Sequence, residues 1–377
     1  MKFITIGHLY SYSFYPLYAS AFSILRSYSF KFFGEAHKFK CTLLFEIFLM
    51  FTGMSLSIFL EIISAIRQFK TDPIKSYCKK LKDKWKYQFL IIFLALLDLS
   101  EFALLSIPFE GDKSEKSSSS LSTIRMMQSL FIGIMCYVFL KIKLHRHHIA
   151  SFILIAIGYI LVIYGKGDFS FELIYLLGFI GNLLYASVEV IHKWLMEYKF
   201  FSPFEIVYLS GLYGLILTGF ICWIIQLSGN DSLSKYANGF GNNLSAMFSN
   251  GYFIIEIIIY LITTLGHNVL FLVTNKYLGP TYHIIIDATS SMVIMLLDIV
   301  ITSTTKILIM QIPGYFLIVI GSLIYNEIII INAGGMDNST KTKIEQRASK
   351  NANGYQDILE ATIEEIEVNQ SLQSLVE

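Results

Sequence analysis

The sequence predicts an all-α polytopic membrane protein with about ten transmembrane helices, arranged as two inverted five-helix repeats. Three observations predict this fold. The 377 residues are 54% hydrophobic and only 15% charged, whereas about a quarter of the residues in soluble domains are charged. Apolar segments of about 20 residues, the length that crosses a bilayer, recur along the chain. Lys and Arg gather in alternate loops between these segments, as they do on the cytoplasmic side of membrane proteins.

The apolar segments follow one another along most of the chain. The first is the weakest, because it contains Pro16 and many Tyr and Ser residues. The expected helices are 3–25, 41–63, 87–108, 124–140, 149–165, 171–192, 204–227, 252–274, 281–303 and 308–331. Residues 1–165 form the first expected repeat and residues 171–331 the second. The polar residues 332–377 are expected to be a disordered cytosolic tail.

Positive charge in the loops sets the expected orientation. The loop at 64–86 carries eight Lys and Arg residues, and the loop at 141–148, "KIKLHRHH", adds three more. The alternate loops at 110–122 and 228–250 are poor in positive charge. The exception is the expected loop 26–40, which carries Arg26, Lys31, Lys38 and Lys40. Because Lys and Arg favour the cytoplasmic side, both termini of a chain with ten spans lie in the cytosol. We expect an endomembrane location, such as the Golgi, a lysosome or a vacuole.

Two stretches of the chain resemble each other. "LIAIGYIL" at 154–161 and "LIVIGSLI" at 317–324 are separated by about 163 residues. This offset maps the fourth and fifth expected helices onto the ninth and tenth. An odd number of spans in each half makes the halves inverted, with a solute site between them near the middle of the membrane. Small residues allow helices to approach closely in membranes, and we expect this of Gly133, Gly158, Gly181 and Gly321.

Ionisable and polar residues interrupt the apolar segments. Such groups are costly in a bilayer and usually face a cavity or a partner. In 281–303, His283, Asp287, Ser290, Ser291 and Asp298 share one face of the expected helix. Arg125 occupies a similar place in the other repeat, and we expect it either to pair with Asp287 or to attract an anionic solute. The residues expected to line a solute cavity are Asp98, Glu101, Arg125, Ser129, Asn268, His283, Asp287, Ser290 and Ser291.

Other roles remain open for some of these residues. Arg125, Glu101 and Asp298 are near helix ends, so their side chains have the alternative of reaching the membrane surface. His267 and Asn268 have the alternative of bonding a neighbouring helix without contacting a solute.

No metal, cofactor or catalytic residue is expected. The four cysteines have neither CxxC nor paired spacing, so neither a disulfide framework nor a zinc site is predicted. The histidines of "HRHH" favour a solvated basic loop over a metal site. The expected partners are a small-molecule solute and the lipid bilayer, with a homodimer as an option, and no nucleic acid.

Five segments, in order, are similar to a known family. They are "LLDLSEFALLSI", "STIRMMQSLFIGIMCYVFLKIKLHRHHIASFILIAIGYILVIYG", "SPFEIVYLSGLYG", "NKYLGPTYHIIIDATSS" and "QIPGYFLIVIGSLIYN". Together they resemble the drug/metabolite transporter superfamily, in its solute carrier 35 branch and F-type members, over about residues 35–331. The resemblance implies alternating-access transport of a small polar or anionic metabolite, such as a nucleotide sugar or nucleoside. His283 and Ser290 stand where the family has arginine, which implies either a different solute or weaker transport.

Two rival functions come from other classes. "GKGD" at 165–168 matches the Gly-x-Gly-Asp pattern of intramembrane aspartyl proteases, which use two acids in one site. No Tyr-Asp pair lies in an earlier helix to supply the second acid. A non-transporting membrane adaptor, with a partner bound to the basic loop or the tail, is the other rival. We therefore expect a transporter and not an enzyme.

Overall fold

The computed structural model describes most of the expected helical region. The described residues are 4–6, 14–36, 43–68, 79, 82–106, 128–141, 143–164, 173–228, 240–245, 251–302, 311–333, 335–340, 343–344, 346–347 and 349. Within them the protein is all-α, as predicted, except for one two-stranded ribbon. The "GKGD" pattern at 165–168 lies outside this part of the chain.

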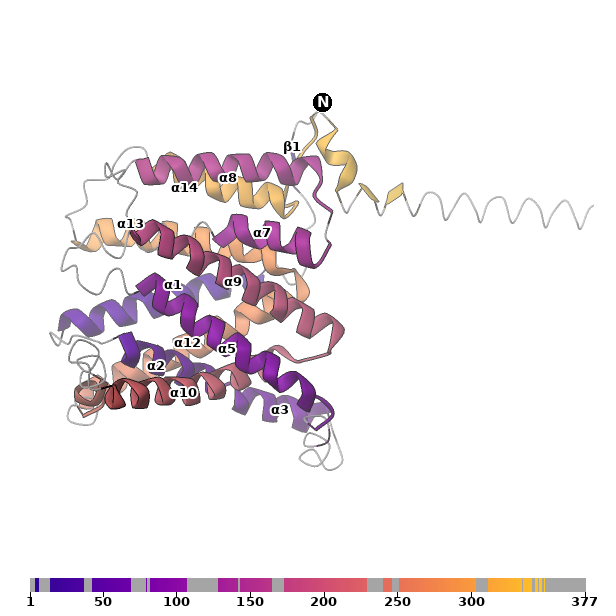
Figure 1. The fold of residues 1–377 in the computed structure, drawn as a ribbon. Coiled ribbons are helices and arrows are strands. Elements are labelled where there is room, and N and C mark those ends of the chain that lie inside the picture. The colour runs from indigo at the N-terminus through magenta and orange to yellow at the C-terminus, as the bar shows by residue number, and fades with distance from the viewer. Residues whose placement is uncertain are drawn as a thin grey trace, which may run out of the picture.

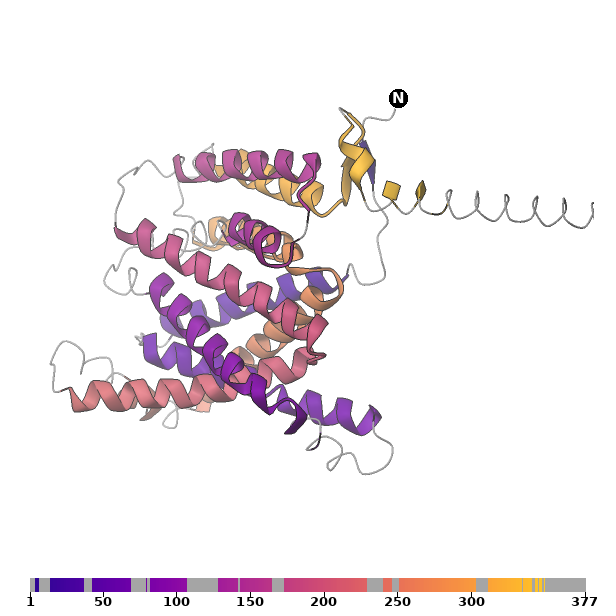
Figure 2. The same cartoon turned by 45° about the vertical axis from the view of Figure 1, so that its right-hand side comes forward.

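Within the described residues, eleven α-helices form a layered bundle (Figures 1 and 2). They are α1 (Phe14–Ala36), α2 (Leu43–Ser55), α3 (Ile58–Gln68), α5 (Gln88–Ser106), α7 (Gln128–Phe139), α8 (Arg146–Tyr164), α9 (Leu173–Tyr198), α10 (Pro203–Leu227), α12 (Gly251–Tyr277), α13 (His283–Thr302) and α14 (Gln311–Tyr325). Short 3-10 turns are η2 (Trp85–Tyr87), η4 (Pro280–Tyr282) and η5 (Met336–Ser339). The expected span 41–63 corresponds to α2 and α3 together, so the helices occupy the places of ten expected spans.

Four helical stretches of the described chain are long and apolar enough to cross a membrane. They are Leu43–Arg67, Trp85–Leu105, Pro203–Leu227 and Phe253–Tyr277. Three shorter apolar helices cover Leu130–Phe139, Arg146–Val162 and Gln311–Tyr325. The largest core lies where α2, α5, α9, α10 and α12 meet, and it includes Phe51, Leu94, Leu195, Ile206 and Leu272.

The first helix is placed differently from the prediction. The expected segment 3–25 contains a strand, β1 (Ile4–Ile6), and α1 then runs from Phe14 to Ala36. Pro16 is the third residue of α1, in the first turn, where a missing backbone N–H costs no hydrogen bond. The helix therefore continues through Arg26, which the sequence pattern had placed in a basic loop.

The end of the last helix also differs from the prediction. Helix α14 stops at Tyr325, although 308–331 was expected to be helical. The N–H of Ile328 donates to the carbonyl oxygen of Leu323, 2.9 Å away, and that of Glu327 to Ile324, 3.1 Å away. These bonds form a Schellman motif, which ends the helix. Strand β2 (Ile329–Ile331) follows, and η5 lies in the expected tail.

Strand β2 pairs with β1 in antiparallel register, with Ile4 opposite Ile331. The two ends of the helical region consequently lie together at one side of the bundle (Figure 1). An even number of crossings places the ends of a chain on the same side, which agrees with ten expected spans.

Glycines allow the close helix contacts that the sequence predicted. Helices α8 and α14 lie side by side at one edge of the bundle in both views (Figures 1 and 2). A Cβ at Gly158 would lie 2.6 Å from the carbonyl oxygen of Gly314, and one at Gly321 would lie 2.8 Å from the Ile155 side chain. A Cβ at Gly133 would lie 2.3 Å from the ring of Phe152, and one at Gly181 would lie 3.1 Å from Leu105. The expectation for these four glycines is confirmed.

Charged residues fix the start of α10. Ser202 is the N-cap, and its hydroxyl and the carboxylate of Glu205 form a capping box, with Pro203 as the first helical residue. Glu205 is fully buried, and one of its oxygens lies 2.8 Å from the Lys84 ammonium. The Ser202 hydroxyl also donates to Glu61 of α3. These bonds join the beginning of α10 to α3 and to the segment before α5.

The "HRHH" segment is not a solvated loop, so that prediction was wrong. Helix α8 begins at Arg146, three residues before the expected start of the span. His147 and His148 are therefore in its first turn, and both are buried. The His148 ring packs against Tyr325 of α14, with 4.6 Å between ring centroids. Packing against α14, which the local pattern did not reveal, removes these histidines from water.

Candidate functional site

A polar cavity of about 120 Å³ lies among the helices. Its lining comes from α1, α2, α5, α7, α9, α10, α12 and α13. The polar side chains of the lining are Ser23, Arg26, Asp98, Glu101, Gln128, Glu189, His192, Ser210, His267, Asn268 and Asp287. The apolar and aromatic ones are Met50, Met54, Phe102, Tyr185, Ile206, Val207, Phe271 and Leu272. Polar groups from distant parts of the sequence thus converge on one cavity.

Four of the predicted cavity residues line this space. They are Asp98 and Glu101 of α5, Asn268 of α12 and Asp287 of α13. These residues lie up to 189 positions apart in the sequence, from 98 to 287, and the fold brings them together. Polar side chains within apolar helices were therefore a useful indicator of a shared cavity.

Two predicted residues lie elsewhere. Ser290 and Ser291 are buried but are not among the residues that line the cavity. The Ser290 hydroxyl lies 3.5 Å from the carbonyl oxygen of Ser20, and the Ser20 hydroxyl lies 3.4 Å from that of Ile286. These contacts join α13 to α1. A hydroxyl on the polar face of α13 can donate its hydrogen bond to a backbone carbonyl of a neighbouring helix without reaching the cavity.

Three predicted residues fall outside what the structure describes. Arg125 is in the segment before α7, and the side chains of Ser129 and His283 are likewise outside the described part. The same holds for the side chain of Asp298. The Arg125–Asp287 pair therefore stays a prediction.

Arg26, Glu189 and His192 line the cavity although they were not among the predicted cavity residues. Arg26 was missed because the first helix was expected to end at residue 25. Glu189 and His192 were signalled by their spacing, because residues three apart lie on one face of a helix. His192 stood at the expected end of its span, but α9 continues to Tyr198 and buries it.

Glu189 is the centre of a buried network between α9 and α12. Its side chain is 2% exposed. The Asn275 amide donates to the Glu189 carboxylate at 2.9 Å and to its backbone carbonyl at 3.1 Å. The ring of His192 lies 3.5 Å from the other carboxylate oxygen. Glu189 and His192 of this network also line the cavity. A change in the charge of either residue would therefore change the electrostatic potential in the cavity.

Lys193 extends this network to the end of α12. Its ammonium donates to the carbonyl oxygens of Asn275 at 3.1 Å and Lys276 at 2.8 Å. Carbonyls in the last turn of a helix lack intrahelical partners, and a cation there also complements the helix dipole. The wall formed by α9 and α12 is therefore held by charge-assisted bonds next to the cavity.

His267 combines interhelical bonding with cavity lining, whereas Asn268 bonds within its own helix. His267 Nδ1 lies 3.4 Å from the carbonyl oxygen of Ala19, which links α12 to α1. Asn268 donates to the carbonyl oxygen of Thr264 one turn earlier, at 2.8 Å. Both residues also line the cavity. Interhelical bonding and cavity lining are not exclusive here.

Carboxyl groups outnumber cations in the described lining. Asp98, Glu101, Glu189 and Asp287 stand against the guanidinium of Arg26 and two histidine rings. An excess of carboxylates in a cavity attracts cations and protons.

Comparisons with known proteins give little further information. No protein-family model matches the chain, and no curated protein matches it. One solved structure, described only as "Crystal structure of protein", shares 14% sequence identity and a TM-score of 0.48 with this chain. The match covers 83% of this chain and 96% of that one. A likeness of this size carries no information on function.

Proposed function

We propose that this chain is a multi-pass membrane secondary transporter or exchanger that moves a small polar solute by alternating access. The observation that supports this function best is the cavity, which gathers charged and amide groups from helices that expose many large apolar side chains. Ionisable groups inside a membrane commonly mark solute pathways or proton relays. The resemblance to the drug/metabolite transporter superfamily supports the same function.

The outer surface of the bundle supports a membrane setting. On α10, the outward side chains of Ile216, Phe220, Trp223 and Leu227 are all more than half exposed. Continuous apolar patches of this kind are rare on monomeric proteins in water and mark contact with lipid or a partner. The two ends of the helical region lie at one side, as an even number of crossings requires, and the proposed cytosolic side follows from the Lys and Arg of the loops.

The proposed architecture consists of two inverted five-helix repeats. In this arrangement α7 and α8 of the first repeat correspond to α13 and α14 of the second. The fifth helices of the two halves, α8 and α14, pack against each other through Gly158 and Gly314. The cavity receives residues from both halves, such as Asp98 and Asp287, as a solute site between repeats requires.

The solute class follows from the size and charge of the cavity. Sites for drug-sized molecules occupy about 300–1,000 Å³, whereas this cavity measures about 120 Å³. This volume has room for a small solute. It also agrees with an occluded state of the transporter, in which the site is contracted. The four carboxyl groups favour a solute with a cationic group, while the expectation of an anion depended on Arg125. A solute screen therefore has to include both signs of charge.

Counterflow in proteoliposomes tests the function. The full chain is reconstituted into proteoliposomes. The vesicles are loaded in turn with unlabelled amines, amino acids, nucleosides, nucleotide sugars or organic anions, and the uptake of the same labelled solute is measured. Glu189→Gln and Asp287→Asn are expected to lower exchange about tenfold or more, because a charged hydrogen bond contributes about 1.5–3 kcal/mol. Glu197→Gln is the matched control, on the same helix as Glu189 but with its side chain 46% exposed.

The outcomes separate the function from the site. Exchange by wild type that both cavity variants retain would contradict the cavity assignment. Failure of every solute class to exchange would contradict transport and favour the adaptor. Peptidase activity lost in Asp168→Asn would instead identify the protease.

A further inference from the structure

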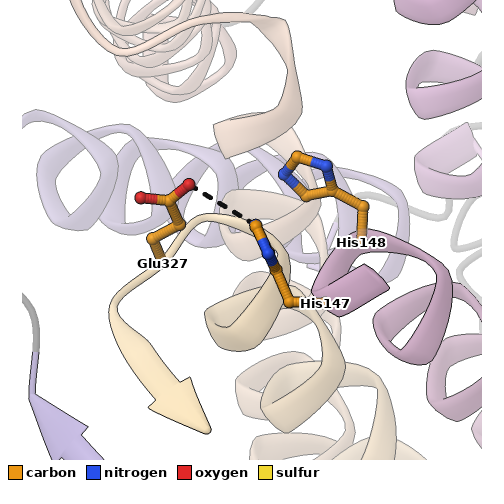
Figure 3. A group of neighbouring side chains, drawn as sticks. All are labelled: His147, His148 and Glu327. Carbon is orange, nitrogen blue, oxygen red and sulfur yellow. Dashed lines mark ion pairs between the residues drawn. The ribbon is translucent and has the colours of Figure 1, made fainter. Parts of the chain in front are cut away.

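A cluster of three potential metal ligands lies where α8 begins and α14 ends (Figure 3). His147 and His148 come from the first turn of α8, and Glu327 comes from the turn between α14 and β2. One ligand atom from each residue lies within 4.8 Å of the other two. None of the three residues lines the cavity described above. The cluster is therefore separate from the proposed solute site.

His147 is buried without hydrogen bonds. Its exposed fraction is 3%, and neither ring nitrogen has a hydrogen-bond partner among the described residues. A buried polar group without a partner costs about 1–3 kcal/mol. The ring is aimed at Glu327, whose Oε1 lies 3.4 Å from His147 Nε2 (Figure 3). A bound ion would satisfy the nitrogen that the protein leaves unsatisfied.

The spacing of the cluster matches metal coordination. Zinc binds histidine nitrogen and carboxylate oxygen at about 2.0–2.2 Å, so two ligands of a tetrahedral ion lie about 3.3 Å apart. The His147–Glu327 distance of 3.4 Å is close to this value. The His147 and His148 rings are 4.0 Å apart between centroids, and the ligand atoms of all three residues lie within 4.8 Å of one another.

The His148 ring is already oriented by its surroundings. Its Nδ1 accepts a hydrogen bond from the backbone N–H of His145, 3.0 Å away, and Tyr325 packs against the ring. Metal binding through Nε2 requires the ring proton to move to Nδ1, and binding through Nδ1 puts the metal in place of the hydrogen bond. Either route gives up the bond from the His145 N–H.

Glu327 lies in a backbone conformation that is unusual for a residue other than glycine. Its φ is +58°, and it occupies the C-terminal position of the Schellman motif that usually contains glycine. A non-glycine residue in a sparsely populated conformation costs about 1–3 kcal/mol. Such strain is common at ligand-binding sites. Here the strained residue directs a carboxylate to a buried imidazole.

We propose that His147, His148 and Glu327 bind one divalent transition-metal ion of the zinc class, with water as the remaining ligand. Two imidazoles and a carboxylate form a donor set that suits such ions. The ion joins the start of α8 to the end of α14 and thereby stabilises the edge of the bundle next to the β1–β2 ribbon. This inference does not depend on transport.

Metal content and thermal stability test the site. The full chain is purified with a tag that contains no histidine, stripped with a chelator, and titrated with Zn²⁺. Wild type is expected to bind one Zn²⁺ per chain and to melt at a higher temperature when loaded. Cobalt provides a second probe, because a four-coordinate Co²⁺ site with nitrogen and oxygen ligands absorbs visible light. His147→Gln and Glu327→Gln are expected to weaken Zn²⁺ binding by about 100-fold or more, since even indirect contacts contribute 10–100-fold.

Two further variants control the result. His145→Gln removes a histidine of the same segment that is outside the cluster, and it is expected to bind Zn²⁺ as wild type does. Glu327→Gly removes the carboxylate but suits the backbone at φ +58°, so it is expected to fold and to lose the metal. Wild type that binds no Zn²⁺ would leave only a His147–Glu327 ion pair and overturn the proposal. So would equal Zn²⁺ affinity in wild type, His147→Gln and Glu327→Gly.

Discussion

Glu205→Gln is expected to lower the free energy of unfolding by about 3–5 kcal/mol. Glu205 is fully buried, and its carboxylate lies 2.8 Å from the ammonium of Lys84, whose side chain is only 12% exposed. The amide keeps the size of the residue and an acceptor for the backbone N–H of Ser202, which now lies 3.3 Å from the carboxylate. It leaves the Lys84 charge buried without its counterion. The measurement is the melting temperature of the purified protein in detergent.

Glu197→Gln is the matched control for this prediction. Glu197 also lies 2.8 Å from a lysine, Lys193, but its side chain is 46% exposed. Water solvates both charges of an exposed pair, so its loss is expected to cost about 0–1 kcal/mol. The double variant Lys84→Met/Glu205→Gln is expected to recover part of the stability, because it removes both charges of this pair. Equal melting temperatures for Glu205→Gln and Glu197→Gln would contradict the importance of burial.

Helix positions were predictable because they depend on local composition. A run of apolar residues long enough to cross a bilayer defines a helix whatever its neighbours are, and ten helical elements lie where ten spans were expected. The errors are at the ends. Arg26 continues α1 although charge suggested a loop, and α14 stops six residues before the expected end, at Tyr325 rather than residue 331. Both ends depend on contacts with distant segments, such as the pairing of Ile4 with Ile331.

The site was predictable only where polarity alone marks it. Asp98, Glu101, Asn268 and Asp287 interrupt apolar segments and do line the cavity. Ser290 shares the polar face of α13 but bonds the backbone of α1, and sequence spacing does not distinguish these two fates. The bond between Asn275 and Glu189 spans 86 residues, so no local pattern contains it. The same is true of Glu327 beside His147.

Gly158→Leu is expected to prevent the close packing of α8 and α14 and to abolish recovery of folded protein. At Gly158 even a Cβ would lie 2.6 Å from the carbonyl oxygen of Gly314, and backbone cannot move aside as a flexible side chain can. The milder Gly158→Ala adds only that atom, and overpacking of this kind costs about 1–3 kcal/mol. The measurement is the melting temperature and the yield of monodisperse protein.

Gly219→Ala is the control, because a Cβ there meets nothing within 4 Å. This residue is inside α10, so alanine is expected to preserve or raise stability through helix propensity, by up to about 1 kcal/mol. A loss of stability equal to that of Gly158→Ala would show that helix backbone, and not packing, decides the effect.

The pair Gly158→Ala and Gly314→Ala then identifies the contact itself. A Cβ at Gly314 would lie 2.7 Å from the carbonyl oxygen of Gly158, so each glycine accommodates the backbone of the other. Once the first alanine has moved the two helices apart, the Cβ of the second alanine no longer clashes with the facing backbone. The combined loss is therefore expected to be smaller than the sum of the single losses, by about 0.5–3 kcal/mol, as for other residues in contact. Additive losses would mean that the two glycines act in separate places, and that α8 and α14 are held together by other residues.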